Sequence, residues 1–361
     1  MAAWMGVAAL VCSGRVVLKR SASGHSWQHM ARVIGGTSAQ QNEYPFAAFV
    51  MVEEGDTVAY CGGTIIARQW ILTAGHCMVS TSGSGGHSLA VPRNTSAAVR
   101  SAGRSGSARE YATVGAGQIS VGVGNIYTNQ MAALKVSEVH VPKDLNLDYF
   151  DNDIALLKLS KKLHYKDSVQ PIHISTASVA DGLTVTGIGW GITSLHSQST
   201  SEILQQVDMV TGNEGLCSRI RPQFSGNDGD YICVTTPDGR DTCSGDSGGP
   251  LLQRCSGDPR NTGIAGNGPW VQLGVTSYGD AASSPTDTVC GYPDGAGFYT
   301  RVAAYLDFVT STTGINRNDL VANCNGGTLD YAGSAAAPQL LAAATRLLAA
   351  ICTVACLALV H

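Results

Sequence analysis

A run of ten residues, 241–250, carries the residue types that an acyl-transfer reaction needs. It reads Asp-Thr-Cys-Ser-Gly-Asp-Ser-Gly-Gly-Pro, so Ser247 lies among three glycines and directly follows Asp246. Glycine permits tight turns and the close approach of other groups to the backbone. A serine displayed on such a turn, among backbone N–H groups, is suited to attack a carbonyl as a nucleophile. The alternative is an ordinary Ser- and Gly-rich loop.

A nucleophilic serine also needs a base and a group that orients the base. His76 is the best candidate for the base, because the neighbouring Cys77 can anchor its loop through a disulfide and a base must be held in place. Asp153 directly precedes an apolar strand pattern, where a partly buried carboxylate can fix the histidine tautomer. An ordinary turn aspartate that caps a strand is the alternative, and it suits Asp151 better than Asp153.

The composition favours an all-β protein from an oxidising compartment. The chain has 361 residues, 44% of them hydrophobic, which is enough for a sizeable core, and its 43 glycines favour short strands and turns. Eleven cysteines are too many for an ordinary reduced cytosolic protein. The cysteine and histidine spacing does not match a zinc site, so we expect no metal. A net charge of −4 favours neither nucleic acid nor an anionic membrane surface as a partner.

The N-terminal residues indicate export and proteolytic processing. An apolar run followed by small residues predicts a signal peptide over residues 1–14, although no Lys or Arg precedes the run. Residues 15–32 are polar and basic and are predicted to be a pro-segment. It ends at Arg32, and cleavage there would free Val33, the first residue of Val-Ile-Gly-Gly, as a new α-ammonium.

The C-terminal segment 334–361 combines small residues, a spacer through Arg346 and an apolar stretch. This is the pattern of a glycolipid-anchor (GPI) signal. A transmembrane helix is one alternative, although it would have to include Arg346, and a buried C-terminal helix is another. Residues 315–333 are expected to be a linker or tail. The protein is therefore expected to be secreted, either free or tethered to the cell surface through its C-terminus.

Between the two ends, short apolar stretches predict strands around residues 46–52, 62–71 and 136–141. The low-complexity insert 80–109 is expected to be a surface loop. It carries Asn94-Thr95-Ser96, the one glycosylation sequon of the chain.

From Val33 to about Thr310 the chain resembles the trypsin-like (chymotrypsin-fold) serine proteases. The resemblance depends on five motifs in the order of that family, and it implies two six-stranded antiparallel β-barrels with the active site between them and a C-terminal helix. We expect this domain to span residues 33–314. The motifs are Val-Ile-Gly-Gly, Leu-Thr-Ala-Gly-His-Cys, Asn-Asp-Ile-Ala-Leu-Leu, Gly-Asp-Ser-Gly-Gly-Pro and Gly-Phe-Tyr-Thr-Arg-Val.

The resemblance also implies a role for each candidate residue. Ser247 would be the nucleophile, His76 the base and Asp153 the group that holds the histidine tautomer. The backbone N–H groups of Gly245 and Ser247 would form the oxyanion hole. After an activating protease cuts at Arg32, the new ammonium of Val33 would pair with Asp246, so the uncut chain would be a zymogen.

Specificity is implied in the same way. Asp241 matches the acid at the bottom of the primary pocket, which selects protein or peptide substrates with Arg or Lys before the cut bond. Gly279 and Gly297 match the residues that keep the pocket open. Ser277 and Tyr278 match the strand that pairs with the substrate backbone, with Tyr278 where many relatives carry Trp. The segment between Gly279 and Cys290, at the pocket border, is longer than usual.

By the same resemblance the disulfides are Cys61–Cys77, Cys217–Cys233 and Cys243–Cys290. Cys255 and Cys324 remain once the end segments are set aside, but sequence alone does not fix their pairing. The acidic calcium loop of some relatives has no match near residues 115–127, so we expect no calcium and no cofactor.

Two functions fit these observations. The first is a monomeric endopeptidase that cuts after basic residues. The second is a catalytically silent binding or inhibitory module on the same fold, since a fold alone does not imply activity. Silent homologues usually lack a triad residue, whereas His76, Asp153 and Ser247 are all present, which favours the enzyme.

Overall fold

The computed structural model describes residues 33–55, 57–80, 111–193, 199–255, 269–281, 290–325 and 328–331, all within one compact unit. The predicted signal peptide, the pro-segment with Arg32, the sequon at Asn94 and the apolar C-terminal segment lie outside the described residues. In the part of the chain that is described, no helix is long and apolar enough to cross a membrane.

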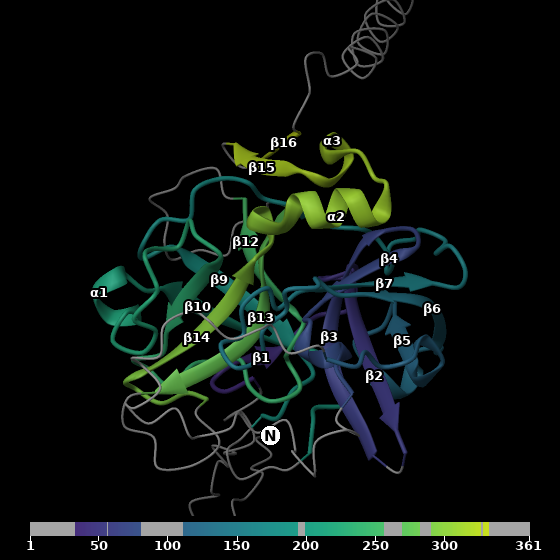
Figure 1. The fold of residues 1–361 in the computed structure, drawn as a ribbon, viewed down its shortest axis with the longest axis horizontal. Helices are drawn as coiled ribbons and strands as arrows, with labels where there is room; N and C mark the ends of the chain where they lie inside the picture. Colours follow the sequence, from purple (N-terminus) through teal and green to yellow (C-terminus); the bar gives the residue numbers. More distant parts are fainter. Residues whose placement is uncertain are drawn as a thin grey trace, which may run out of the picture. The chain divides into compact units, whose positions relative to one another are not determined.

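The first half of the domain is a closed antiparallel barrel of six strands, drawn in purple and blue in Figure 1. Its strands follow the order β2-β3-β4-β7-β6-β5, and alternating apolar residues such as Val50 and Val52 of β2 point into the core. The predicted strand 62–71 is in fact the end of β3 and the start of β4, joined by a tight turn at Arg68 and Gln69. The strands are β2 (Ala47–Glu54), β3 (Thr57–Ala67), β4 (Trp70–Thr73), β5 (Ile119–Val123), β6 (Leu134–His140) and β7 (Ala155–Leu159).

The second half closes in the same way. Its strands follow the order β10-β11-β14-β13-β12-β9, and pairing of β9 with β10 completes the ring. The two six-stranded antiparallel barrels expected from the sequence are therefore confirmed. The strands are β9 (Thr184–Gly189), β10 (Gln205–Thr211), β11 (Tyr231–Thr235), β12 (Pro250–Arg254), β13 (Trp270–Ala281) and β14 (Gly295–Arg301), with the short β1 (Thr37–Ser38) on β10 and β8 (His173–Ile174) on β13.

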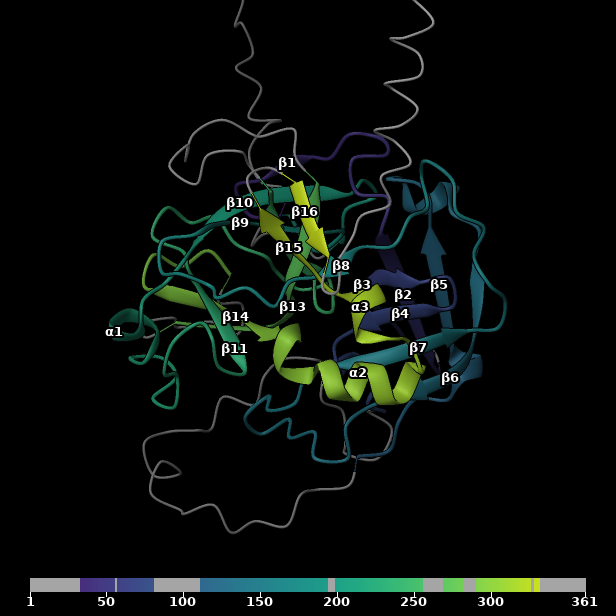
Figure 2. The same ribbon diagram turned by 90° about the horizontal axis from the view of Figure 1, so that it is seen from above.

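Helix α2 (Leu306–Thr313) is the expected C-terminal helix, and Figure 2 shows it running from the second barrel towards the first. It ends at Gly314, whose φ of 70° is the left-handed conformation that glycine adopts readily. Leu306 and Val309 are buried in a core cluster that also contains residues of the first barrel. Burial of this apolar helix face couples the two barrels and so stabilises the region between them.

Residues 315–325 and 328–331 form regular structure, unlike the linker or tail expected there from the sequence. They form helix α3 (Arg317–Leu320) and a hairpin of β15 (Ala322–Asn325) and β16 (Thr328–Tyr331). Leu320, Val321 and Ala322 are fully buried, which gives the segment an apolar anchor. The side-chain oxygen of Asn323 accepts hydrogen bonds from the backbone N–H groups of Thr176, at 2.8 Å, and Ala177, at 3.1 Å.

Four disulfides are present in the described residues. Three are the pairs implied by the family resemblance, and the fourth joins Cys255 to Cys324. The fourth bond fixes the C-terminal hairpin to the end of β12.

Candidate active site

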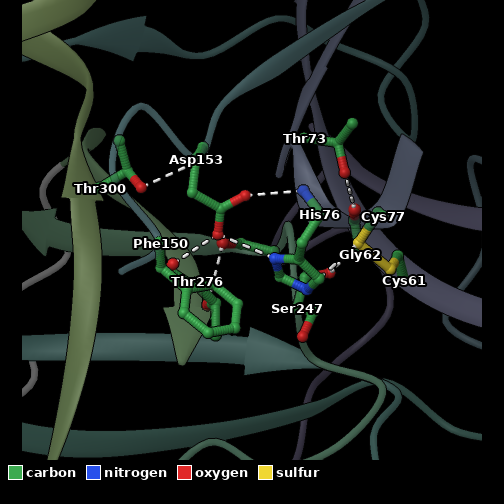
Figure 3. A network of polar contacts seen from close by, with 12 residues as sticks. Cys61, Gly62, Thr73, His76, Cys77, Phe150, Asp153, Ser247, Thr276 and Thr300 are labelled. Atoms are coloured by element: carbon green, nitrogen blue, oxygen red, sulfur yellow. Dashed lines mark hydrogen bonds and ion pairs between the residues drawn. A yellow bond between two sulfur atoms is a disulfide. The ribbon is translucent and has the colours of Figure 1, made fainter. Parts of the chain in front are cut away.

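Three polar side chains converge at the junction of the barrels (Figure 3). His76 begins the short 3-10 helix η2 (His76–Met78) after β4, Asp153 lies just before β7, and Ser247 lies just before β12. The imidazole Nδ1 of His76 lies 2.8 Å from Oδ2 of Asp153, and the backbone N–H of His76 donates to Oδ1 at 2.7 Å. The Cys61–Cys77 disulfide holds η2 against β3. The structure thus brings together all three residues predicted from the sequence.

Asp153 is fully buried, and both of its carboxylate oxygens have donors. In addition to the His76 contacts, the hydroxyl of Ser277 donates to Oδ2, and the hydroxyl of Thr300 donates to the Asp153 carbonyl at 2.8 Å. Burial alone would raise the pKa of Asp153, but His76 and the hydrogen bonds hold this pKa below its ordinary value. An ionised carboxylate in this position favours the His76 tautomer with its proton on Nδ1, which leaves Nε2 free to accept a proton.

The Ser277 contact was not anticipated, because sequence analysis assigned Ser277 to the substrate-binding strand. The register of β13 against β14 shifts between Thr276 and Tyr278, which leaves Ser277 as a bulge residue. Bulges redirect a side chain relative to its neighbours in the strand. The bulge therefore places the Ser277 hydroxyl on Asp153 while Tyr278 keeps its place in the sheet.

Ser247 is held by backbone contacts from both barrels. Its carbonyl accepts a hydrogen bond from the Gly62 N–H at 2.7 Å, and the next N–H, of Gly248, donates to the Thr276 carbonyl at 2.8 Å. Ser247 O and His76 Nε2 both lie within 3.8 Å of the Cys77 sulfur. No hydrogen bond joins the Ser247 hydroxyl to Nε2 within the described structure, and such bonds commonly tighten only when substrate binds.

The backbone at Gly245 requires glycine. Its φ is +96°, and a Cβ there would lie 2.9 Å from the Cα of Gly191. The N–H groups of Gly245 and Ser247 have no hydrogen-bond acceptor among the described residues. Two neighbouring N–H donors without acceptors can bind a developing oxyanion.

Asp241 is a buried acid with an unpartnered oxygen. Its side chain is 3% exposed, Oδ2 accepts from the Gly291 N–H at 3.0 Å, and Oδ1 has no partner in the described part of the chain. Burial raises the pKa of Asp241 to about 7. A Cβ on Gly297 would lie 3.3 Å from Oδ1, so glycine keeps the approach to this oxygen open.

Asp246 is a second buried acid without a cation. It is 0% exposed, and among the described residues its carboxylate accepts only from the backbone N–H groups of Gly191, at 2.7 Å, and Cys243, at 2.8 Å. Burial raises the pKa of Asp246 to about 7 despite these two bonds. Within the described ranges, neither Asp241 nor Asp246 therefore has a positively charged partner for its ionised form.

The segment at Val33 lies next to these acids. Val33 is fully buried in the core of the second barrel, and Ile34 forms an antiparallel bridge with Asp241. The φ of Val33 is +43°, which is strained for a β-branched residue.

The strand segment 277–279 has one open edge. Tyr278 and Gly279 pair with Phe298 and Gly297 of β14, whereas the pairing of β13 with β12 stops at Val275. Among the described strands, none pairs with the other edge of 277–279. An extended peptide can add to such an edge through main-chain hydrogen bonds.

An aromatic wall beside this strand was missed in the sequence analysis. The ring of Phe150 stacks on Tyr278 at 4.9 Å and meets the His76 ring edge-on at 5.8 Å, and Tyr278 stacks on Phe298 at 5.0 Å. Burial raises the pKa of Tyr278 to about 12, so this phenol is neutral. The local sequence marks Phe150 only by its place three residues before Asp153.

The described residues include one group with metal-ligand spacing, formed by Cys61, His76 and Cys77. Both of its cysteines are joined in a disulfide, so they offer no thiolate to a metal ion.

Comparison with known proteins agrees with this fold. The Trypsin family model matches residues 33–112 and 112–309. Brachyurin of Leptuca pugilator is 28% identical over 78% of this chain and 99% of its own length, and Trypsin-1 of Astacus astacus is 29% identical over 77% and 98%. Transmembrane protease serine 11C of Mus musculus is 26% identical over 84% of this chain and 57% of its own length. The chain belongs to the trypsin family of serine proteases.

Proposed function

We propose that the protein is a secreted serine endopeptidase, made as a zymogen, that hydrolyses peptide bonds after Arg or Lys. The observation that carries the proposal is the buried Asp153–His76 pair beside Ser247. Asp241 supports it, because one oxygen of this buried acid has no partner among the described residues and lies next to Gly297, which pairs with Gly279 of the open strand edge. Family membership supports protease chemistry on protein substrates. The basic-residue specificity and the activation step depend on the two acids with raised pKa values.

In this mechanism the Ser247 hydroxyl attacks the scissile carbonyl and His76 Nε2 takes its proton. Asp153 keeps the proton of the neutral imidazole on Nδ1 and stabilises the imidazolium, without itself being protonated. The oxyanion binds the N–H groups of Gly245 and Ser247, and one such donor is worth about 3 kcal/mol of barrier. His76 then protonates the leaving amine, and water hydrolyses the acyl-enzyme with His76 again acting as base.

Specificity follows from the unpaired oxygen of Asp241. A guanidinium or ammonium group that enters the pocket would pair with this oxygen and lower the pKa of the acid. A neutral side chain would leave the buried group without a partner, which costs binding energy in the transition state. The open edge of 277–279 would hold the substrate backbone in an extended conformation.

Activation follows from Asp246 and Val33. Cleavage after Arg32 by an activating protease would create an ammonium at Val33, which would pair with Asp246. It would also remove the constraint on the φ of Val33, because a free amino terminus has no preceding peptide bond. The new ion pair would stabilise the loop that carries Gly245, so the uncut chain should be nearly inactive.

The setting of the protein belongs to the same proposal. Four disulfides fit an oxidising, extracellular compartment. We propose glycosylation at Asn94, a monomeric catalytic domain and, from the C-terminal sequence pattern, a GPI tether at the cell surface.

The proposal is tested by labelling with an organophosphonate that reacts only with activated serine. After trypsin cuts at Arg32, the wild-type protein is expected to take one label, on Ser247, and Ser247→Ala is expected to take none. The uncut protein should label far more slowly. Cut protein that takes no label would favour the silent binding module.

A further inference from the structure

One cation, Arg221, joins the loop that leads to Asp153 with the substrate-binding strand. Its Nη1 donates to the carbonyl of Tyr149 at 2.8 Å and to the hydroxyl of Tyr278 at 2.6 Å, and its Nη2 pairs with the Asp151 carboxylate at 2.6 Å. The guanidinium carbon lies 3.9 Å from the ring centroid of Tyr231. The Arg221 side chain is only 11% exposed. Arg221, which follows helix α1 (Glu214–Cys217), thus contacts both barrels.

The loop that Arg221 holds has a strained backbone. Phe150 and Asn152 have φ values of +55° and +57°, which are uncommon for residues other than glycine. Such conformations persist where surrounding contacts fix them. Here Tyr231 donates to the Phe150 carbonyl at 2.8 Å, and Tyr305 donates to the Asn152 side chain at 3.1 Å. Arg221 adds a hydrogen bond to Tyr278, whose ring also stacks on Phe150 of this loop.

The aromatic pair of Phe150 and Tyr278 is the part of this network that lies next to His76. Phe150 stacks on Tyr278 and meets His76 edge-on, beside the open strand edge. A peptide bound along 277–279 with a basic residue at Asp241 would lay its preceding residues across these two rings. The two rings therefore form the surface that substrate residues upstream of the cut would contact.

We propose that Arg221 is a positioning residue that fixes the Phe150–Tyr278 pair and so controls binding of the substrate residues that precede the basic one. This inference rests on the proposed endopeptidase function. The planar guanidinium meets two acceptors through Nη1 and a third through Nη2 while stacking on Tyr231. Lysine presents a point charge without this fork, so it cannot make the same set of contacts.

The test compares two arginine substrates that share a scissile bond type but differ in length. One is an acyl-arginine amide with no residue before the arginine, and the other is a tetrapeptide amide that ends in arginine. For Arg221→Met we expect about a tenfold loss of kcat/KM on the tetrapeptide, mainly through KM, because a bond to a charged group is lost. For the short substrate, kcat/KM should change less than about twofold, because this substrate has no residue that could contact the two rings. Arg221→Lys should not rescue the loss.

Two further variants sharpen this test. Arg219→Met is the matched control, since Arg219 is exposed and lies only two residues earlier in the chain, and it should leave both substrates unchanged. Tyr278→Phe removes only the hydroxyl that Arg221 contacts, and it should show a smaller loss of the same kind. Adding Tyr278→Phe to Arg221→Met should cost nothing more, because the two changes remove one interaction.

An equal loss on both substrates, or no loss on either, would overturn the inference, because it would make Arg221 a structural brace alone. If Arg221→Met does not fold, Tyr278→Phe decides the matter by the same comparison of substrate lengths. Activated wild-type protein that cleaves neither substrate would instead contradict the proposed function, which keeps the two failures distinct.

Discussion

The buried carboxylates of the active-site region belong to two regions with opposite electrostatics. Asp153 receives donors on both oxygens, and its pKa lies below the ordinary value. Asp241 and Asp246 are as deeply buried, but they receive only backbone N–H groups, and their pKa values rise to about 7. Side chains of the chain itself thus donate to Asp153, the acid proposed for the chemistry. Asp241, the acid proposed for selectivity, would instead pair with a cation of the substrate. Asp246, the acid proposed for activation, would pair with the new amino terminus.

The largest expected effect is the loss of kcat when Asp153 is replaced. Asp153→Asn should lower kcat about 10⁴-fold, because an amide favours the wrong histidine tautomer. The loss should be the same for substrates with basic and neutral side chains, as measured by initial rates on matched peptides. Asp144→Asn, at an exposed acid of the same connection between β6 and β7, is the nearby control, and it should keep most of the activity. A loss confined to substrates with basic side chains would contradict this role, because it would make Asp153 an acid that binds the substrate cation.

The next largest effect is the loss of kcat/KM on arginine substrates when Asp241, the acid proposed for the pocket, is replaced. Asp241→Ser should lower kcat/KM on arginine substrates by about 10³-fold or more, because the cation loses its partner. Labelling of Ser247 by a small neutral phosphonate should be almost unchanged, which separates Asp241 from Asp153. Asp238→Ser, a change at an exposed acid three residues earlier, serves as the control. Retained cleavage after Arg and Lys would show that Asp241 does not line the pocket.

The third prediction concerns activation. Arg32→Ala should give a secreted protein that trypsin does not activate, with at least about 100-fold less activity than the cut form, as for a switch held mainly in its inactive state. Hydrolysis of an arginine amide, before and after trypsin treatment, measures this directly. Arg20→Ala, at another basic residue of the predicted pro-segment, should remain activatable. Full activity in uncut Arg32→Ala would remove the proposed role of Asp246.

The smallest effect is on stability, and its sign differs between the two regions. Because the folded pKa of Asp246 is raised from its ordinary value of about 3.9, its contribution to stability is full below pH 4 and is lost as the pH rises through about 7. Because the pKa of Asp153 is lowered, its contribution is present above pH 4 and is lost at lower pH.

Thermal unfolding of uncut Ser247→Ala protein between pH 3 and 8 measures both contributions. Asp246→Asn should gain a few degrees relative to its parent as the pH rises from 5 to 8, since about 1 kcal/mol corresponds to a few degrees. The Asp153→Asn variant should instead show its largest decrease in melting temperature, relative to the parent, above pH 4. In the cut protein the ammonium of Val33 should reverse the result for Asp246→Asn. If the melting temperatures of the two variants changed with pH in the same way, the predicted difference between Asp246 and Asp153 would be contradicted.

The site residues predicted from the sequence are those whose proposed roles lie in short runs. Ser247, Asp246 and Asp241 fall within ten residues, and His76 and Asp153 each precede or follow a strand that the hydrophobic pattern marks. The barrels followed from the order of motifs, and three disulfides from the family resemblance. These signals are local, so one sequence was enough to read them.

What sequence missed depends on contacts between distant residues. Ser277 meets Asp153 across 124 positions, and Arg221 meets Tyr278 across 57, and neither has a local signature. Helix α3 and the hairpin after it were also missed, because their buried residues, 320–322, form a run too short to predict an element. The turn at Arg68 and Gln69 has neither Gly nor Pro, so nothing marked the division of 62–71 into two strands.

The central claim is that Asp241 pairs with a cationic side chain of the substrate and that Asp246 pairs with the α-ammonium formed at Val33 by cleavage. It is tested most directly by the rates of cut and uncut protein on two peptides that differ only in arginine or its neutral isostere citrulline before the scissile bond. We predict that the cut protein cleaves the arginine peptide about 10³-fold or more faster in kcat/KM, and that the uncut protein cleaves neither appreciably. Equal rates on the two peptides, or equal rates before and after the cut, would contradict it.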